Sequence, residues 1–370
     1  MKRLWFMSSL SAVLLLGGCL PSFGPDQEEV IQENEEQLEE TVMIPDMQLK
    51  EEFYNTVLPF KKSASRGLVV DNIYTKYDMQ EAEEGLLRLS ALHFDPKNYY
   101  FQEGQYIDRK TANAWLARSS VNDAGLNPPS GKEGEDDAPI YLAHIVEQNY
   151  LTMTDDKKLR LSGISIGLAL NSVYYGADGK ETELSDEELQ KKGIEMADTI
   201  VSRLRAKEGL SDIPIVIGLF KQEKRNSIVP GTYFATAYAD KGKSSASGWK
   251  EVNEQYVLLP ASSSIDNYRE INTTFNNFKQ DIDEYFPSFV NVIGTAFLKE
   301  GQMRSLKIQV PIQFYGTSET IGFTQYMTSL VNKYFSKIDI EVSITSVNGP
   351  EALIVKRANE EEPFVHIYGY

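Results

Sequence analysis

The chain has 370 residues, of which 41% are hydrophobic and 11% aromatic, and its formal net charge is −17. This composition supports a sizeable core and two or three domains of ordinary size, which argues against a disordered chain. The acidic balance argues against nucleic-acid binding, because phosphates need a basic surface.

Residues 1–18 have the pattern of a secretory signal peptide. The basic pair Lys2 and Arg3 precedes an apolar run from Leu10 to Leu16, and small residues follow it. The run is shorter than the ~20 residues that a membrane span requires. We therefore expect this segment to be removed on export.

The residue after the expected cleavage site is the only cysteine of the chain, Cys19. Leu16, Gly17 and Gly18 before it complete a sequence that resembles the lipobox of bacterial lipoproteins. In a lipobox the cysteine thiol receives a diacylglyceryl group and becomes the mature N-terminus. We predict lipidation of Cys19; an ordinary signal peptide that contains a cysteine is the alternative.

Residues 19–48 are predicted to be a lipidated acidic tether. Nine carboxylates and no basic side chain lie between positions 20 and 47, and such density extends a chain by repulsion. A short acidic helix is the alternative. The mature chain has 35 basic and 54 acidic side chains, a net charge of −19. Electrostatic docking on anionic lipid is therefore disfavoured, and the acyl chains would hold the protein on the membrane.

Residues 49–139 read as a helical N-terminal region. Phe53, Val57 and Phe60 fall at helical spacing. A lone cysteine allows no intramolecular disulfide, so the fold must rely on packing. The other predicted elements of this region are helices at 79–92 and 110–118, the second carrying Trp115, and a long loop at 122–139.

Residues 140–260 are predicted to form a first α+β unit. Every second residue from Ile164 to Leu170 is large and apolar, and the residues between are small, so one face of this strand could admit a helix closely. Ser185 and Glu188 fit a capping box before an amphipathic helix. Further strands are predicted at 213–220 and 233–238.

Residues 261–370 are predicted to form a second α+β unit with a leading helix. The order strand, Tyr-Gly, helix, strand, turn, strand occurs in both units, which favours an internal duplication over two unrelated pieces. The fold class is therefore α+β, with a helical N-terminal region and two related β-α-β-β units. The elements of the second unit are a helix at 265–286, a strand at 306–314, a helix at 323–334, a strand at 338–344, a turn at Asn348-Gly349 and a strand at 352–355.

One motif in the sequence is shared with an enzyme class, the serine hydrolases. Gly163 to Gly167 matches Gly-x-Ser-x-Gly, in which a nucleophilic serine needs a strained turn between strand and helix. Ser165 instead lies inside the alternating strand, where the glycines form its small face. No catalytic residue is predicted. An extracellular hydrolase acting on cell-wall material is the alternative, and it depends on this match and on export.

Metal and cofactor chemistry has little support in the sequence. The histidines are His93, His144 and His366, and no two of them have ligand spacing. With a single cysteine beside them, no metal and no cofactor is predicted.

Four further segments are unusual: 57–68, 100–106, 125–128, and 285–287 with 292–294. Together with the lipobox they resemble the CamS family, the sex-pheromone precursor lipoproteins of Gram-positive bacteria, from about Phe53 to Tyr370. The resemblance implies a lipid-anchored protein on the outer face of the cell membrane. It also implies that the signal peptide is trimmed to a hydrophobic peptide that acts in conjugation signalling.

The pheromone candidate is the stretch before Cys19, and an apolar signal core with no second role is the alternative. Its residues are Ala12, Val13, Leu14, Leu15, Leu16, Gly17 and Gly18.

A basic loop in the acidic chain suggests a site for an anionic group such as a wall polymer or a peptide carboxylate. Small residues beside the basic ones would let a backbone approach, and a solvated surface is the alternative. We thus expect a non-enzymatic surface lipoprotein whose mature domain binds an unknown small ligand or protein partner. The loop residues are Lys61, Lys62, Ser63, Ser65, Arg66 and Gly67.

Overall fold

The computed structural model describes residues 28–33, 39–45, 53–65, 73–131, 138–176, 179–261, 268–286, 291–313 and 316–369. Cys19, the lipobox and the candidate peptide Ala12 to Gly18 lie outside these ranges, as do Arg66 and Gly67. Within them, every helix is too short or too polar to cross a bilayer.

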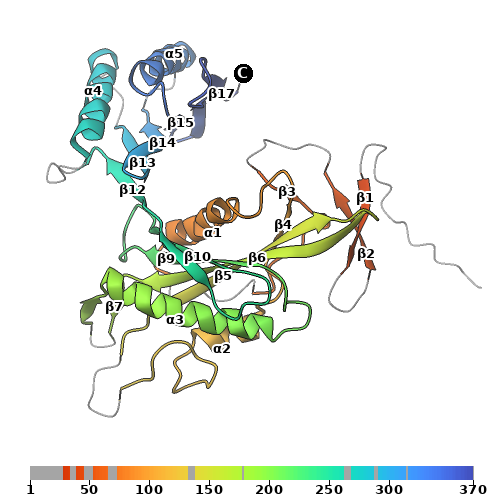
Figure 1. Ribbon diagram of the computed structural model, residues 1–370. Helices are drawn as coiled ribbons and strands as arrows, with labels where there is room; N and C mark the ends of the chain where they lie inside the picture. Colours follow the sequence, from red (N-terminus) through yellow and green to blue (C-terminus); the bar gives the residue numbers. More distant parts are fainter. Residues whose placement is uncertain are drawn as a thin grey trace, which may run out of the picture.

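Two mixed sheets follow one another along the chain (Figure 1). The first has the order β11-β10-β9-β6-β5-β4-β3 and the second the order β12-β13-β14-β15-β16-β17. The strands of the first are β3 (Asn55–Thr56), β4 (Tyr100–Glu103), β5 (Leu142–Met153), β6 (Lys158–Asn171), β9 (Ile215–Gln222), β10 (Thr232–Ala239) and β11 (Ser247–Glu251). Those of the second are β12 (Glu254–Leu259), β13 (Ile293–Lys299), β14 (Gln302–Pro311), β15 (Asp339–Ser346), β16 (Gly349–Lys356) and β17 (Phe364–Ile367).

The helices cover these sheets in layers (Figure 1). On the first sheet, α2 and α3 lie on one face and α1 on the other. On the second, α4 and α5 share one face. The helices are α1 (Lys76–Ser90), α2 (Arg109–Leu116), α3 (Asp186–Arg205), α4 (Arg269–Tyr285) and α5 (Thr317–Tyr334), and a small hairpin joins β7 (Val173–Tyr175) to β8 (Glu181–Glu183).

Both sheets repeat one topology. Apart from the β7β8 hairpin, which is inserted between β6 and α3, the order β4-α2-β5-β6-α3-β9-β10-β11 matches the order β12-α4-β13-β14-α5-β15-β16-β17. In each, an antiparallel hairpin (β5β6, β13β14) leads through a helix into a parallel neighbour (β9, β15), and an antiparallel strand follows. The expected β-α-β-β unit is the centre of a longer repeat. The boundary expected at residue 260 needs correction, because β12 pairs with β13 in the second sheet.

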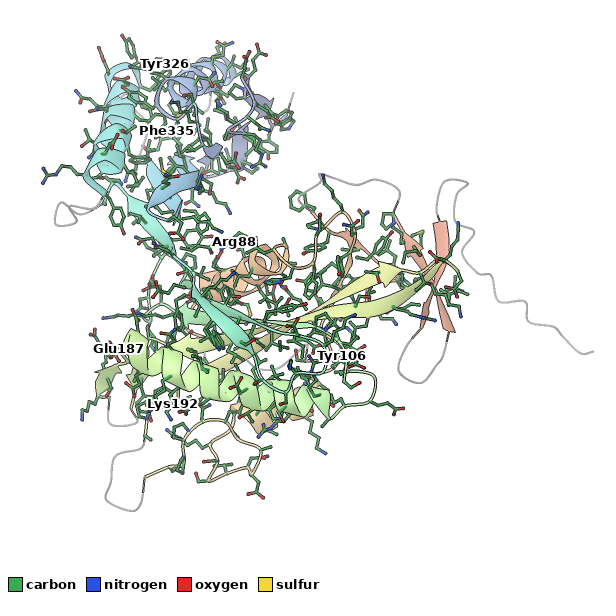
Figure 2. The ribbon with its side chains drawn as sticks, viewed as in Figure 1. Arg88, Tyr106, Glu187, Lys192, Tyr326 and Phe335 are labelled. Carbon is green, nitrogen blue, oxygen red and sulfur yellow. The ribbon has the colours of Figure 1, made fainter. Side chains whose placement is uncertain are left out.

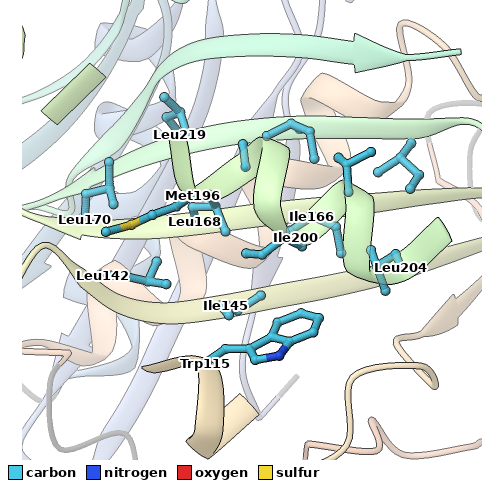
Figure 3. Packing of buried hydrophobic residues seen from close by; sticks show 14 of the residues in the cluster. Trp115, Leu142, Ile145, Ile166, Leu168, Leu170, Met196, Ile200, Leu204 and Leu219 are labelled. Carbon is cyan, nitrogen blue, oxygen red and sulfur yellow. The ribbon is translucent and has the colours of Figure 1, made fainter. Parts of the chain in front are cut away.

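Helix α3 forms where the sequence predicts it. The Ser185 hydroxyl accepts the Glu188 backbone N–H at 3.2 Å, which satisfies one free donor of the first turn. The capping box is only half formed, because the Glu188 carboxylate accepts the Tyr141 hydroxyl at 2.5 Å instead. The apolar stripe with Met196, Ile200 and Leu204 packs on β6 and β9 in the main core (Figure 3).

The small face of β6 admits aromatic rings as well as a helix. A Cβ at Gly163 would lie 2.4 Å from the Phe94 ring, and one at Gly167 would lie 2.3 Å from the Tyr233 hydroxyl. Leu86 of α1 comes next, 3.4 Å from the Gly167 position. The predicted close approach is confirmed, with Tyr233 between the helix and the sheet.

The helical interpretation of residues 53–60 is wrong. Residues 55–56 form β3, and Leu58 exchanges backbone hydrogen bonds with Met43 at 2.7 and 2.8 Å. A proline disfavours helical geometry at the residue before it, and Pro59 also lacks an N–H. The region is therefore mixed rather than mainly helical, since β4 also belongs to it.

The acidic segment departs from a solvated tether in two places. β1 (Glu28–Glu33) and β2 (Glu39–Ile44) pair antiparallel, and Ile31 and Gln32 join the first sheet beside β6. Val42 and Ile44 are buried against Leu151 and Leu159. Burying each such side chain stabilises the fold by roughly 1.5–3 kcal/mol, which outweighs the like-charge repulsion that water and salt screen.

One polar cluster joins α1 to the second sheet. Arg88 forms ion pairs with Glu81 on its own helix and, at 3.0 Å, with the fully buried Glu254 of β12. The Tyr256 hydroxyl donates to Glu81 at 2.6 Å. The Arg88 guanidinium lies 4.7 Å above the centre of the Phe297 ring. Figure 2 labels Arg88 on α1. Lys299 of β13 also pairs with Glu254, at 3.2 Å, so Arg88 is the cation of Glu81 and one of two cations beside Glu254.

Replacing this arginine should loosen the junction. Arg88→Ala leaves Glu81 buried without its cation, while Glu254 keeps Lys299, so we expect a loss of roughly 2–4 kcal/mol in the free energy of unfolding, measured in urea. Lys224→Ala is the matched control, since its pair with Glu183 is solvent-exposed and should contribute less than about 1 kcal/mol. Equal stability of the two variants would contradict the interpretation.

Candidate functional site

A cavity of about 380 Å³ lies between α1, β4, β5 and the loop at 61–65. Its size falls in the range of small-molecule sites, ~300–1,000 Å³. Its lining residues are Ser63, Ser65, Met79, Glu83, Glu84, Leu87, Phe101, Glu103, His144, Ile145, Val146, Glu147 and Gln148.

Helix α1 forms one wall of the cavity. It starts at Thr75, whose side chain accepts the Asp78 backbone N–H at 3.1 Å. Met79, Glu83 and Leu87 follow at four-residue spacing and therefore share one side of the helix. The Gln148 amide of β5 donates to the Glu83 carbonyl at 2.8 Å, which holds this wall against the sheet.

The loop at 61–65 forms the opposite rim. The Ser63 backbone N–H donates to the Glu103 carboxylate at 2.5 Å, and the Ser63 and Ser65 hydroxyls lie 2.8 Å apart. Ala64 donates its N–H to the carbonyl of Gly104 at 2.9 Å. The loop is therefore bound to the end of β4.

Of the described residues of the predicted basic loop, 61–65, only the two serines line the cavity. Lys62 is exposed and Lys61 is partly buried, and neither contributes to the lining. The structure brings the serines next to carboxylates rather than to further basic groups. The anionic-ligand interpretation of this loop stays a prediction.

Glu147 shapes the floor of the cavity. Its carboxylate accepts the backbone N–H groups of Gln105 at 3.0 Å, Tyr106 at 3.0 Å and Ile107 at 2.7 Å. Burial raises the pKa of Glu147, and these three N–H groups act against the rise. A Cβ at Gly104 would lie 2.4 Å from the Glu147 Cβ, so this close approach needs glycine. The unusual segment 100–106 therefore has a structural role: its last residues pack against Glu147 and donate backbone hydrogen bonds to the Glu147 carboxylate.

His144 is a buried histidine in the cavity wall. Its side chain is 8% exposed, and its Nδ1 atom is buried with no hydrogen-bond partner in the described part of the chain. Burial lowers the pKa of His144 to about 4. The imidazole is therefore neutral at pH 7, with one nitrogen able to accept and one able to donate a hydrogen bond.

The lining is acidic on one part and apolar on another. Four acidic residues contribute, and no lysine or arginine is among the lining residues within the described ranges. Such a site suits a ligand that carries hydrogen-bond donors and an apolar portion. The carboxylates are Glu83, Glu84, Glu103 and Glu147, and the apolar side chains are Met79, Leu87, Phe101, Ile145 and Val146.

Ser165 is far from the geometry of a nucleophile. It lies within β6, its side chain is fully buried, and its hydroxyl is 2.5 Å from that of Ser90 on α1. A hydrolase of this motif needs its serine exposed on a sharp turn.

The three histidines lie apart from one another. His93 stacks on Tyr238 at 4.6 Å, and His366 contacts Tyr368 edge-on near the end of the chain. Across the described ranges, no three His, Cys, Asp or Glu side chains gather closely enough to hold a metal ion.

The segment 125–128 has a structural role. The Asn127 amide donates to the carbonyls of Leu116 and Leu142 at 2.8 and 2.9 Å. Its side-chain oxygen accepts the backbone N–H groups of Tyr141 and Leu142 at 3.0 and 2.9 Å. This side chain fixes the end of α2 to the start of β5.

Sequence reasoning missed His144 and Glu147 as lining residues. A signal existed, because Leu142–Met153 reads as an apolar strand interrupted by His144, Glu147 and Gln148. Polar side chains in a buried strand are uncommon unless they have partners or a ligand.

The repeated sheet topology and the acidic cavity under α1 define a two-repeat α+β protein, and solved sex pheromone precursors have a similar structure. The crystal structure of a sex pheromone precursor from Lactobacillus salivarius subsp. salivarius UCC118 matches with a TM-score of 0.81 and 29% identity, over 89% of this chain and 99% of that one. The C-terminal domain of the sex pheromone staph-cAM373 precursor from Staphylococcus aureus matches with a TM-score of 0.70 and 35% identity, over 81% and 99%.

The family assignment follows from the sequence match. The model of the CamS sex pheromone cAM373 precursor family matches residues 60–362. The chain therefore belongs to the CamS family, as its resemblance predicted. No curated protein compared with the chain matches it.

The buried His144 should make stability depend on pH. An unfolded histidine titrates near ~6.5, above the pKa of about 4 in the fold. The unfolded chain therefore binds more protons between these values, and stability is lost as the pH falls from ~7 to ~4. We expect this group to contribute roughly 2–4 kcal/mol of the loss, measured by urea unfolding at several pH values.

His144→Gln should flatten this slope because glutamine does not titrate. His366→Gln is the control, since that histidine is exposed, and it should keep the slope of the parent chain. An unchanged slope in His144→Gln would show that the lost stability comes from other groups.

Proposed function

We propose that the chain is a lipid-anchored protein on the outer face of the cell membrane, with two separate products. The leader supplies a hydrophobic conjugation peptide, and the mature body is a non-enzymatic ligand-binding domain. The match of the family model over residues 60–362 carries the precursor assignment. The Leu16 to Cys19 sequence supports the anchor.

The two products have different physical requirements. A peptide cut from residues 12–18 lies outside the part that matches the family model, and it needs only its own apolar side chains. The body needs two packed sheets and a cavity. A substitution in residues 12–18 can therefore change the peptide without changing the folded body, and a substitution in the body can leave the peptide unchanged.

The ligand-binding role rests on the cavity between α1 and β5. It is preformed by backbone contacts of Glu103 and Glu147, and it exposes a neutral histidine and several carboxylates to one space. Pre-organised polar groups of this kind provide specificity in small-molecule sites. The buried Ser165 adds nothing in favour of wall hydrolysis.

Lipidation should depend on Cys19 alone. Cys19→Ser removes the thiol that receives the lipid, so we expect the chain to move from the membrane fraction to the medium. Mass spectrometry of the amino-terminal peptide should show the diacylglyceryl mass on the parent chain. Ser22→Ala, which leaves the lipobox intact, should stay membrane-bound. A membrane-bound parent chain with a free Cys19 thiol would overturn the anchor.

The leader peptide should act by itself. A synthetic peptide of residues Ala12 to Gly18 is expected to raise plasmid transfer from donor cells that respond to such peptides, counted as transconjugants per donor. A peptide of the same composition in scrambled order is the control. Equal transfer with both peptides would remove the pheromone role and leave the anchor untouched.

A further inference from the structure

We propose that the cavity between α1, β4 and β5 binds a small basic peptide, with a guanidinium or ammonium group among its carboxylates and an apolar side chain on its hydrophobic wall. The inference deepens the proposed ligand-binding role and rests on it. It reverses the charge expected from the sequence, where the basic loop suggested an anionic ligand.

The charge of the lining comes first. Glu83, Glu84 and Glu103 contribute carboxylates from α1 and β4, and Glu147 of β5 lies beside them with its carboxylate held by three backbone N–H groups. Among the lining residues that the structure describes there is no basic side chain. An ionised carboxylate can accept about four hydrogen bonds, so Glu103, which accepts the Ser63 N–H, can also accept donors from a bound cation. Attraction between opposite charges is stronger in a partly enclosed cavity than in open water.

The neutral histidine is an independent sign of a ligand. The Nδ1 atom of His144 is buried without a partner in the described part of the chain. A buried polar atom without a hydrogen-bond partner destabilises the fold, so such atoms usually mark a missing partner. A neutral imidazole can accept an N–H from a bound cation without repelling its charge.

The apolar wall of the cavity indicates that the ligand also has an apolar side chain. Met79 and Leu87 lie along one side of α1, and Phe101 of β4 also faces the cavity. A thioether adapts to different apolar shapes, and an aromatic face attracts a nearby cation. The cavity of about 380 Å³ therefore fits a short peptide with one basic and one apolar side chain better than a bare ion.

A divalent metal fits the site less well. Calcium takes six to eight oxygen ligands, and no cluster of three acidic or histidine side chains forms within the described ranges. A guanidinium needs only one well-placed carboxylate, which it binds through two parallel N–H···O bonds.

The test uses dipeptide amides that are N-acetylated, because a free α-amino group would add a second cation, and it compares two that differ only in the charge of the side chain. The full-length chain, purified from membranes in a mild detergent, is titrated with arginyl-leucinamide and with citrullyl-leucinamide, in which urea replaces guanidinium. We expect the arginyl probe to bind about tenfold more tightly by isothermal titration. Its affinity should also weaken as salt screens the carboxylates.

Variants locate the binding. Glu103→Gln keeps the oxygen that accepts the Ser63 N–H but removes the charge, and it should weaken the arginyl probe about five- to tenfold. His144→Leu should weaken both probes, because it removes the imidazole and not a charge. Glu187→Gln on α3, on the other face of the sheet (Figure 2), is the control and should bind as the parent does. Thermal unfolding confirms that each variant is folded.

The following results would contradict the proposal. Equal affinity for the arginyl and citrullyl probes, or an unchanged affinity of Glu103→Gln for the arginyl probe, overturns the basic-peptide site. Binding of glutamyl-leucinamide that is lost in Lys62→Ala overturns this inference but keeps the body as a binding domain for the anionic class. Binding of none of the three probes overturns the inference as well, while the tests on Cys19 and on the leader peptide decide the remainder of the proposed function.

Discussion

The close packing of α1 against the small face of the first sheet is the constraint on which the rest of the structure depends. Glycines on β6 and β9 leave room for the ring of Tyr233, whose hydroxyl donates to the Ala82 carbonyl of α1 at 2.6 Å. Asp78 in the first turn accepts the Gly231 N–H at 2.8 Å. A side chain larger than hydrogen at these strand positions would displace the helix, because packed interiors leave no spare volume.

The position of α1 then serves two other parts of the molecule. One side of the helix carries Glu81 and Arg88, which meet β12 and β13 of the second sheet. Another side carries Met79, Glu83 and Leu87, which line the cavity. The second repeat has its own pair of helices, α4 and α5, on one face of its sheet. Within the described ranges, the first sheet alone has a helix, α1, on its opposite face as well. The cavity forms there because α1 lies over the polar residues His144 and Gln148 of β5.

The sequence pointed to some of the segments that form the cavity, but it did not predict that they come together. The segments 57–68 and 100–106 stood out in the sequence, and the structure joins them through Ser63 and Glu103. The reason for Gly104 lies in Glu147, more than forty residues further along, and no local pattern connects the two. The same holds for His144, which reads as one polar residue in a strand until its burial and its unpaired Nδ1 are known. The charge of the site is likewise a tertiary property, because it sums side chains from α1, β4 and β5.

The sequence by itself determined the elements whose pattern is local. The alternation around Ser165, the Ser185 cap and the apolar stripe of α3 appear as expected, since a strand or helix period depends on neighbours along the chain. The tertiary structure decided the rest: β12 belongs to the second sheet, residues 55–56 form a strand, and the acidic β1 and β2 pair beside β6. These features depend on which apolar surfaces, distant in the sequence, become buried against each other. Such burial produces no periodic pattern along the sequence from which it could be predicted.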